Sequence, residues 1–462
     1  MRSLLPRYDA GINFYLCRDS LISKPRIIPR AEHPISRQNL PDSALKVLHR
    51  LNDAGFQAYL VGGCVRDMLL GMQPKDFDVA TDATPEQVKS LFRNCRLIGR
   101  RFRLAHVIFG REMIEVATFR GQHSENIVHS DEGRILRDNV YGSLEEDAFR
   151  RDFTINALYY GVDDLNIIDY TDAIHDIHAK RLRLIGDPET RFREDPVRML
   201  RAVRFAAKLG FKIDESNEQQ IFALGDLLED IPAARLFDEV IKLLQSGHGV
   251  QSLRGLQHYN LLQYLVPMTH GSMQMERAGY WQSFIEQALN NTDQRLQIGK
   301  TTNPAFMYAV LLWAPVREYL LETGASGLEQ GAPKTRQIQD AAAEVFNRQV
   351  HYTAIPRRFT TQIGEIWAMQ PRLEQYEGER VYKLLAHPRF RAAYDFLLLR
   401  ESVGEATNAR GQFWTDIQEH DERAQEVMEE ARMSRSHDRD RGRGPSQNRR
   451  RRPRRSSQRN RS

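Results

Sequence analysis

The hydrophobic pattern of this chain changes near residue 187, and that change constrains the fold more than any other feature. Between about residues 43 and 170, short apolar stretches of strand type alternate with short helical stretches. After residue 187, apolar residues recur every three to four positions in long runs, which is typical of amphipathic helices. The sequence therefore predicts an α+β fold, in which a small mixed-sheet domain precedes an all-α remainder.

The expected elements of the first part are short. We expect helices over 43–54, 65–70 and 85–91, and strands over 58–61, 76–80, 104–109 and 113–119. The strongest helix of the second part covers 196–209 and ends at Gly210. Further helices are expected over 216–228, 234–246, 251–264, 280–290, 304–322, 336–347, 357–369 and 379–402.

Composition excludes several classes of protein. The chain has 462 residues and is 41% hydrophobic, which suffices for two to four domain cores at roughly 100–200 residues per domain. Its three cysteines contain no Cys-x-x-Cys pair, which argues against a disulfide framework and a zinc ribbon. No apolar run approaches the roughly 18 residues of a membrane span, so we expect no transmembrane segment and a cytoplasmic protein.

Charge is distributed unevenly along the chain. The net charge is +5, but residues 435–462 hold twelve Arg and two Asp, which leaves −5 for the rest. No large apolar residue follows Met433, so we expect this tail to be disordered. A run of Arg charges attracts RNA through counterion release, and we favour that role over a purely solubilising one.

The densest group of unusual residues covers 60–79, with the sequences LVGGCVRDMLLG and KDFDV. Gly62 and Gly63 separate a strand from a helix, so backbone N–H groups can approach an anion closely. Asp76 and Asp78 are two positions apart in an expected strand and therefore point to one face. Each feature alone is commonly a turn or a solvated strand edge. Together, across one short helix, they favour a nucleotide and Mg²⁺ site.

Two further carboxylates are candidates to complete such a site. Glu115 lies in the apolar run 113–119, where a carboxylate is costly to bury unless it is paired or binds metal. A solvent-facing Glu115 is the alternative. Asp152 lies beside Arg151 and near Asn156, a set that could bind triphosphate and ribose, with a surface ion-pair cluster as an equal alternative. The residue pattern leaves the choice between Glu115 and Asp152 open.

A third block opens the strong helix at 196–209. Asp195 and Arg198 are three positions apart, and Pro196 stands at the helix start. The two side chains can therefore meet on one face and present a donor–acceptor edge to a base. On this block alone, an ordinary ion pair is the better interpretation.

Together the three blocks resemble the class II nucleotidyltransferases, which comprise bacterial poly(A) polymerases and CCA-adding enzymes. The signature GGxVRDxLLG…DFD matches 62–78, RRDFTINAL matches 150–158, and EDPxRxLRAxRFAxxLGF matches 194–211. The resemblance implies a catalytic head, a neck and a helical body that holds RNA. We accordingly expect a loosely ordered leader (1–38), a nucleotidyltransferase head (39–170), a helical neck with the base-reading helix (171–230), an RNA-binding body (231–430) and a disordered tail (431–462).

The resemblance also implies roles for individual residues. Asp76 and Asp78 would hold two Mg²⁺ ions, and Asp152 would belong to the catalytic carboxylates. Glu115 is the further candidate for a catalytic carboxylate, and it comes from the residue pattern rather than from the resemblance. The triphosphate and the ribose would be contacted by Gly62, Gly63, Arg66, Arg151 and Asn156. The base would be contacted by Asp195 and Arg198, with Glu194 in support.

The shared motifs do not separate the two activities of the family. The segment 97–107, three body segments (231–237, 303–306, 387–395) and the Arg-rich tail resemble the poly(A) polymerase branch. That branch implies template-independent addition of AMP from ATP to RNA 3′ ends, with pyrophosphate release, in RNA polyadenylation and decay. Proteins of RNA decay are then expected partners. The alternative is a CCA-adding tRNA nucleotidyltransferase.

Overall fold

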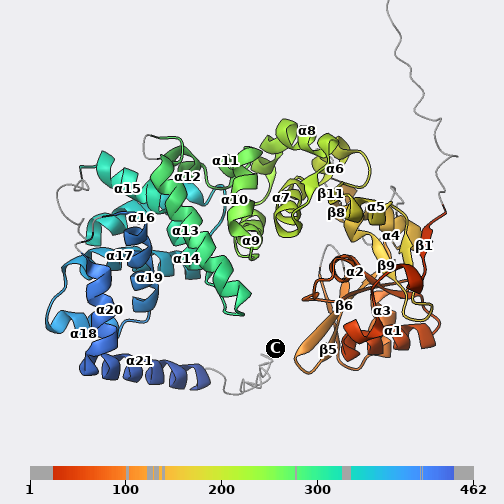
Figure 1. Cartoon of the computed structure of the whole chain (residues 1–462), viewed down its shortest axis with the longest axis horizontal. Helices are drawn as coiled ribbons and strands as arrows, with labels where there is room; N and C mark the ends of the chain where they lie inside the picture. The colour runs from red at the N-terminus through yellow and green to blue at the C-terminus, as the bar shows by residue number, and fades with distance from the viewer. Residues whose placement is uncertain are drawn as a thin grey trace, which may run out of the picture. The chain divides into compact units, whose positions relative to one another are not determined.

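The computed structural model describes residues 24–99, 103–121, 128–129, 135–137, 141–275, 278–324, 335–405, 407 and 409–441. The chain divides into two compact units, residues 1–265 and 266–462. Strands occur only in the first unit among the described residues, and the second is helical (Figure 1). This arrangement confirms the predicted α+β fold.

The first unit is built on an eight-stranded mixed sheet in the order β1-β10-β9-β2-β3-β6-β5-β4. Neighbours are antiparallel except β3 and β6, which are parallel. The strands are β1 (Arg26–Ile28), β2 (Ala58–Val61), β3 (Asp78–Thr81), β4 (Cys95–Ile98), β5 (Leu104–Phe109), β6 (Glu112–Thr118), β9 (Leu158–Tyr160) and β10 (Ile167–Asp169). Two small ribbons add β7 (Val128–His129) with β8 (Ile135–Arg137), and β11 (Arg181–Leu182) with β12 (Lys212–Ile213).

Helices cover the sheet, and the central strands β2 and β9 carry consecutive apolar residues that are mostly buried. Helices α1 (Asp42–Asp53) and α3 (Pro85–Leu91) pack against the sheet, and α2 (Gly63–Leu69) connects β2 to β3. Leu144 and Ala148 of α4 (Leu144–Arg150) pack on Val61, Ala80 and Phe119. Since alternate strand residues share a face, Asp78 lies on the face of Ala80 that α4 covers.

Helices form the rest of the first unit and all of the described second unit. The first unit continues with α5 (Ala173–His178), α6 (Pro188–Glu194), α7 (Val197–Leu209), α8 (Glu215–Leu224), α9 (Ala233–Leu244), α10 (Gly249–His258) and α11 (Leu262–Leu265). The second contains α12 (Pro267–Ser272), α13 (Ala278–Gln297), α14 (Pro304–Leu311), α15 (Trp313–Glu322), α16 (Thr335–Gln349), α17 (Arg357–Gln375), α18 (Glu379–Leu385), α19 (Phe390–Ser402), α20 (Arg410–His420) and α21 (Glu422–Arg441). Among the described residues, no helix combines the length and apolarity that crossing a bilayer requires.

Several predicted boundaries differ from the structure. The strand predicted to start at Asp76 starts at Asp78, because Val61 pairs with Asp78 and the residue that would face Asp76 already lies in α2. The helix predicted over 304–322 breaks at Leu312, and the one over 379–402 is two helices, with Pro388 in the break. Periodicity alone does not register such short interruptions, since the apolar face continues across them.

A regular element of the first unit precedes the predicted head. Strand β1 lies within the predicted leader and pairs with β10, and α21 continues to Arg441 within the predicted tail. Residues 1–23 and 442–462 lie outside the described residues. The five region boundaries stay predictions.

Candidate active site

The parallel pairing of β3 and β6 places two of the predicted carboxylates side by side. Asp78 faces Glu115 in register, although they are 37 positions apart in the chain. Glu115 is about two-fifths exposed, and its Oε2 lies 3.3 Å from Nε2 of His106 on β5. Asp76 is exposed in the loop just before β3. The structure thus brings Glu115, rather than Asp152, next to Asp78.

The Asp78 carboxylate lies in a negative environment. Asp78 is exposed at the start of β3, yet desolvation by the groups packed around its carboxyl and the charges of Glu115 and Asp76 raise its pKa to about 6, while Arg151 acts in the opposite direction. Carboxylates that repel one another in this way are stabilised by a divalent cation.

Asp78 and Glu115 line a cavity of about 520 Å³. Seven arginines and six acidic residues line it, which suits a polyanion bound through metal. The lining residues are Asp78, Glu115, Ala117, Arg120, Asp147, Arg150, Arg151, Asp152, Arg191, Asp195, Val197, Arg198, Arg201, Arg235 and Glu239. Of the predicted site residues, Asp78, Glu115, Arg151, Asp152, Asp195 and Arg198 line the cavity, whereas Gly62, Gly63, Arg66, Asp76, Asn156 and Glu194 are not part of the lining.

Gly62 and Gly63 lie at the junction between β2 and the first turn of α2. Gly62 ends β2 with φ 79°, a conformation that favours glycine. A Cβ atom on Gly62 would lie 3.5 Å from Nη1 of Arg151, and one on Gly63 would lie 3.5 Å from Nη2 of Arg66. These are ordinary van der Waals distances, so a Cβ atom would fit at either position, and the positive φ of Gly62 is what favours glycine there.

Arg66 and Asn156 are buried and bonded to protein groups. Arg66 is 2% exposed and donates from Nε to Asp67 Oδ1 (2.8 Å) and from Nη1 to Asn156 Oδ1 (2.5 Å). Lys208 of α7 donates to the other Asp67 oxygen at 2.9 Å. This chain of contacts joins α2 to α7, so the geometry favours a positioning role for Arg66.

The Asp152 carboxylate is engaged by protein donors on both oxygens. Its Oδ1 accepts from the Phe153 N–H (2.8 Å) and Asn156 Nδ2 (3.2 Å), and its Oδ2 accepts from Arg201 Nε (2.7 Å). Although burial opposes it, these donors lower the pKa of Asp152 to about 2, with Arg201 contributing most. Asp152 therefore stays anionic and anchors Arg201 of α7.

Arg151 is held by two residues that the sequence did not single out. Its Nε donates to Asp147 Oδ2 (3.1 Å) and to the Tyr159 hydroxyl oxygen (3.0 Å), and that hydroxyl donates to Asp147 at 2.6 Å. Asp147 precedes Arg151 by one helical turn, a spacing that could have predicted the pair.

The predicted meeting of Asp195 with Arg198 is not observed. Asp195 is extended (φ −151°) between α6 and α7, so helical spacing does not apply to it. Its Oδ2 accepts instead from Arg235 Nη2 of α9 (2.8 Å), while Arg198 donates to Glu194 Oε2 (2.9 Å). Asp195 Oδ1 is buried without a partner among the described residues and is thus an acceptor available to a ligand.

Comparison with known proteins gives consistent family assignments. Three family models match: the poly A polymerase head domain (58–183), the probable RNA and SrmB-binding site of polymerase A (210–273) and the polymerase A arginine-rich C-terminus (330–456).

Individual proteins agree with these models. Poly(A) polymerase I of Escherichia coli O6:H1 is 50% identical to this chain, and the alignment covers 83% of this chain and 84% of that protein. The CCA-adding enzyme of Lactobacillus helveticus is 40% identical over 48% of this chain and 55% of its own. An apo CCA-adding enzyme structure has a TM-score of 0.58 at 20% identity, covering 82% of this chain and 85% of that one.

Proposed function

The chain belongs to the bacterial poly(A) polymerase I family, and from this premise we propose how its active site works. It is a polynucleotide adenylyltransferase that adds AMP from ATP to RNA 3′ ends and releases pyrophosphate. One observation supports the location of the reaction above all: Asp78 and Glu115 lie in register beside an arginine-lined cavity.

The residues present fit a divalent metal. No group of three acidic, His or Cys side chains is preassembled as a metal site among the described residues, but Mg²⁺ commonly binds through one or two carboxylates plus phosphate oxygens and water. Asp78 and Glu115 supply such a pair, and Asp76 lies close enough to influence the Asp78 pKa. Two Mg²⁺ ions held there would acidify the RNA 3′-hydroxyl and neutralise charge on the departing pyrophosphate.

The protein groups orient the two substrates. Arg151 and its neighbours along the cavity would hold the triphosphate, so that the RNA 3′-oxygen attacks the α-phosphorus in line as the bond to the β-phosphate breaks. The unpartnered Oδ1 of Asp195 would accept a hydrogen bond from the adenine amino group, and Arg198 would donate to the ring. Asp152 supports this wall through Arg201 rather than through metal.

The cellular setting follows from the substrates. We propose that the enzyme acts on transcripts in the cytoplasm, where ATP and RNA meet, and that its products enter RNA decay with decay proteins as partners. The relatives support RNA as the substrate.

An extension assay tests the reaction. Purified protein, Mg²⁺ and an unstructured RNA are incubated with each nucleoside triphosphate alone, and we expect a long ladder with ATP and little with CTP. Asp78→Asn and Glu115→Gln should each slow extension on the order of 1000-fold, since a metal ligand is worth several kcal/mol in the transition state.

The matched control is Asp53→Asn, an exposed carboxylate of α1 outside the cavity, which should extend RNA as the wild type does. Near wild-type extension by Asp78→Asn would contradict the proposed mechanism. Addition of CTP and then ATP, only on tRNA lacking its 3′ end, would indicate the CCA-adding activity instead.

A further inference from the structure

The first unit holds a second and larger cavity, of about 1070 Å³, outside the one that contains the carboxylates. It exceeds the roughly 300–1,000 Å³ that is usual for pockets of small molecules, so its size suits a segment of a polymer. Arg191 of α6 lines both cavities, whereas Glu194, its partner at 2.9 Å, lines the larger one and not the smaller.

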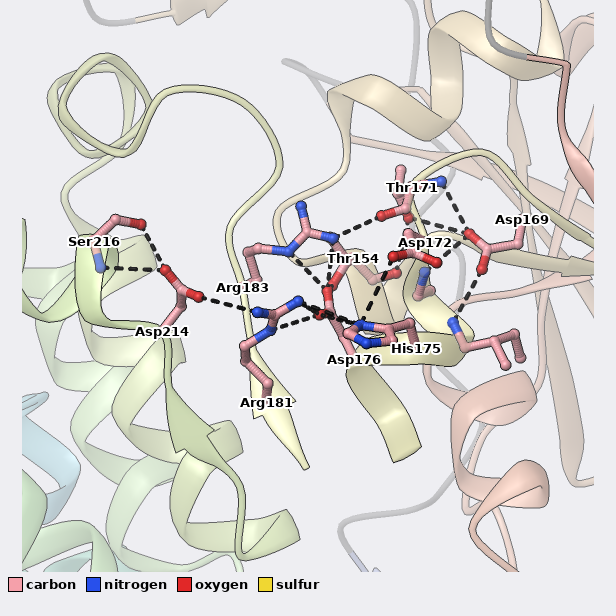
Figure 2. Close-up of polar contacts among 12 residues, drawn as sticks. Thr154, Asp169, Thr171, Asp172, His175, Asp176, Arg181, Arg183, Asp214 and Ser216 are labelled. Carbon is pink, nitrogen blue, oxygen red and sulfur yellow. Dashed lines mark hydrogen bonds and ion pairs between the residues drawn. The ribbon is translucent and has the colours of Figure 1, made fainter. Parts of the chain in front are cut away.

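Two guanidinium groups, those of Arg181 and Arg183, line this cavity and are held by a shared carboxylate. The fully buried Asp176 accepts from Arg181 Nε (2.7 Å) on one oxygen and from Arg183 Nε (2.9 Å) on the other (Figure 2). Arg183 Nη2 also donates to the Thr171 carbonyl at 2.9 Å, while its Nη1 has no partner among the described residues. Both arginine side chains are about one third exposed, and their ion pairs with the buried Asp176 hold them in place.

The remaining charges of the cavity are unequally available. Lys24 and Arg26 are exposed cations at its edge. The buried Asp169 is bonded to the N–H groups of Thr171, Ala173 and Ile174, so little of its negative charge is free. Glu194 is likewise bonded to arginines, whereas Asp172, which also lines the cavity, has a side chain about three-fifths exposed. Five cationic side chains (Lys24, Arg26, Arg181, Arg183, Arg191) therefore line the cavity together with one accessible carboxylate, so the surface that a ligand meets is cationic on balance.

Two aromatic rings complete the cavity. Phe149 and Tyr170 line it with ring centroids 6.5 Å apart, edge to face, and both are only partly buried. Cations that follow a phosphate backbone, combined with aromatic rings on which bases stack, are the features of single-stranded nucleic-acid sites.

We propose that this cavity binds single-stranded RNA upstream of the 3′ end that the active site extends. Phosphates contact Arg183, Lys24 and Arg26, and a base stacks on Tyr170. Because Arg191 borders both cavities, one RNA strand can pass from the larger cavity to the smaller. This inference rests on the proposed function for the identity of its ligand, and it assigns the upstream RNA a place on the first unit.

The test compares a long unstructured RNA with a trinucleotide primer. We expect Tyr170→Ala to weaken binding of the long RNA about tenfold, the scale of one lost stacking contact, and Tyr170→Phe to bind like the wild type. Arg26→Ala should reduce the slope of log K against log salt by about one. Extension of the trinucleotide with ATP should remain unchanged in all variants.

Lys46→Ala is the matched charge control, since Lys46 is an exposed cation of α1 in the same unit and lines neither cavity. Unchanged long-RNA binding by Tyr170→Ala would overturn the proposal. An increased KM for ATP in Tyr170→Ala, equal with both primers, would also overturn it and indicate a free-nucleotide site. Failure of the wild type to extend either primer would refute the proposed function. The comparison of long-RNA binding between the wild type and Tyr170→Ala would still test whether the larger cavity binds RNA.

Discussion

At the scale of single residues, the structure distinguishes carboxylates that the sequence left equivalent. Glu115 and Asp152 were both candidates to complete the metal site. Glu115 lies in register with Asp78, whereas both oxygens of Asp152 are already bonded to protein donors. The groups that a carboxylate contacts in the fold therefore indicate its role better than the residues adjacent to it in the sequence.

We expect Arg235 to position Asp195, the carboxylate proposed above to contact the adenine base. Arg235→Ala removes the 2.8 Å contact that orients Asp195, so the carboxylate can rotate and its free oxygen loses its fixed direction. We expect the preference for ATP over CTP, measured as the ratio of kcat/KM values, to fall about tenfold, the scale of one charge-assisted hydrogen bond. Arg235→Lys should retain part of the preference, and an unchanged ratio in Arg235→Ala would exclude this role.

At the scale of elements, buried polar contacts connect helix α2, which begins at Gly63, to helix α7. Arg66 bonds to Asn156, Asn156 bonds to Asp152, and Asp152 bonds to Arg201 of α7. Such contacts fix the orientation of two helices because each buried group needs its particular partner. The motifs at 62–78, 150–158 and 194–211 are therefore connected by buried polar contacts in the fold, although they are separate in the sequence.

This connection predicts a pH dependence of stability. The folded-state pKa of Asp152 is about 2, below its ordinary value of 3.8, so its ion pair stabilises the fold fully above about pH 4 and is lost as pH falls toward 2. A difference of almost two pKa units corresponds to about 2 kcal/mol. Denaturant unfolding should show Asp152→Asn to be less stable than the wild type at neutral pH, with the gap narrowing between about pH 4 and pH 2. A gap that stays constant with pH would contradict the assignment.

At the scale of the whole molecule, the positive charge is concentrated far along the chain from the proposed active site. The proposed active site and the larger cavity proposed to bind RNA lie in residues 1–265, whereas nine of the twelve arginines of residues 435–462 lie in 442–462. The family model of the arginine-rich C-terminus covers 330–456. Attraction to RNA through that tail needs no fixed geometry, since it comes from released counterions.

Deleting residues 442–462 should consequently weaken RNA binding and flatten its dependence on salt, while kcat at saturating RNA stays near that of the full chain. The control replaces the segment with a neutral Gly/Ser sequence of the same length, which should behave like the deletion. The dissociation constant is measured over a range of salt concentrations. An unchanged slope of log K against log salt would show that the tail does not contact RNA.

The sequence by itself determined the α+β division, the strands 58–61 and 104–109, the helical remainder and the family. Those features depend on local periodicity and on short motifs, which are written in neighbouring residues. Only the tertiary structure decided that Glu115 lies beside Asp78, that Asp195 bonds to Arg235 and that Asp76 precedes its strand. Each of these results depends on the register and packing of elements distant in the chain, and spacing along a sequence carries no record of either.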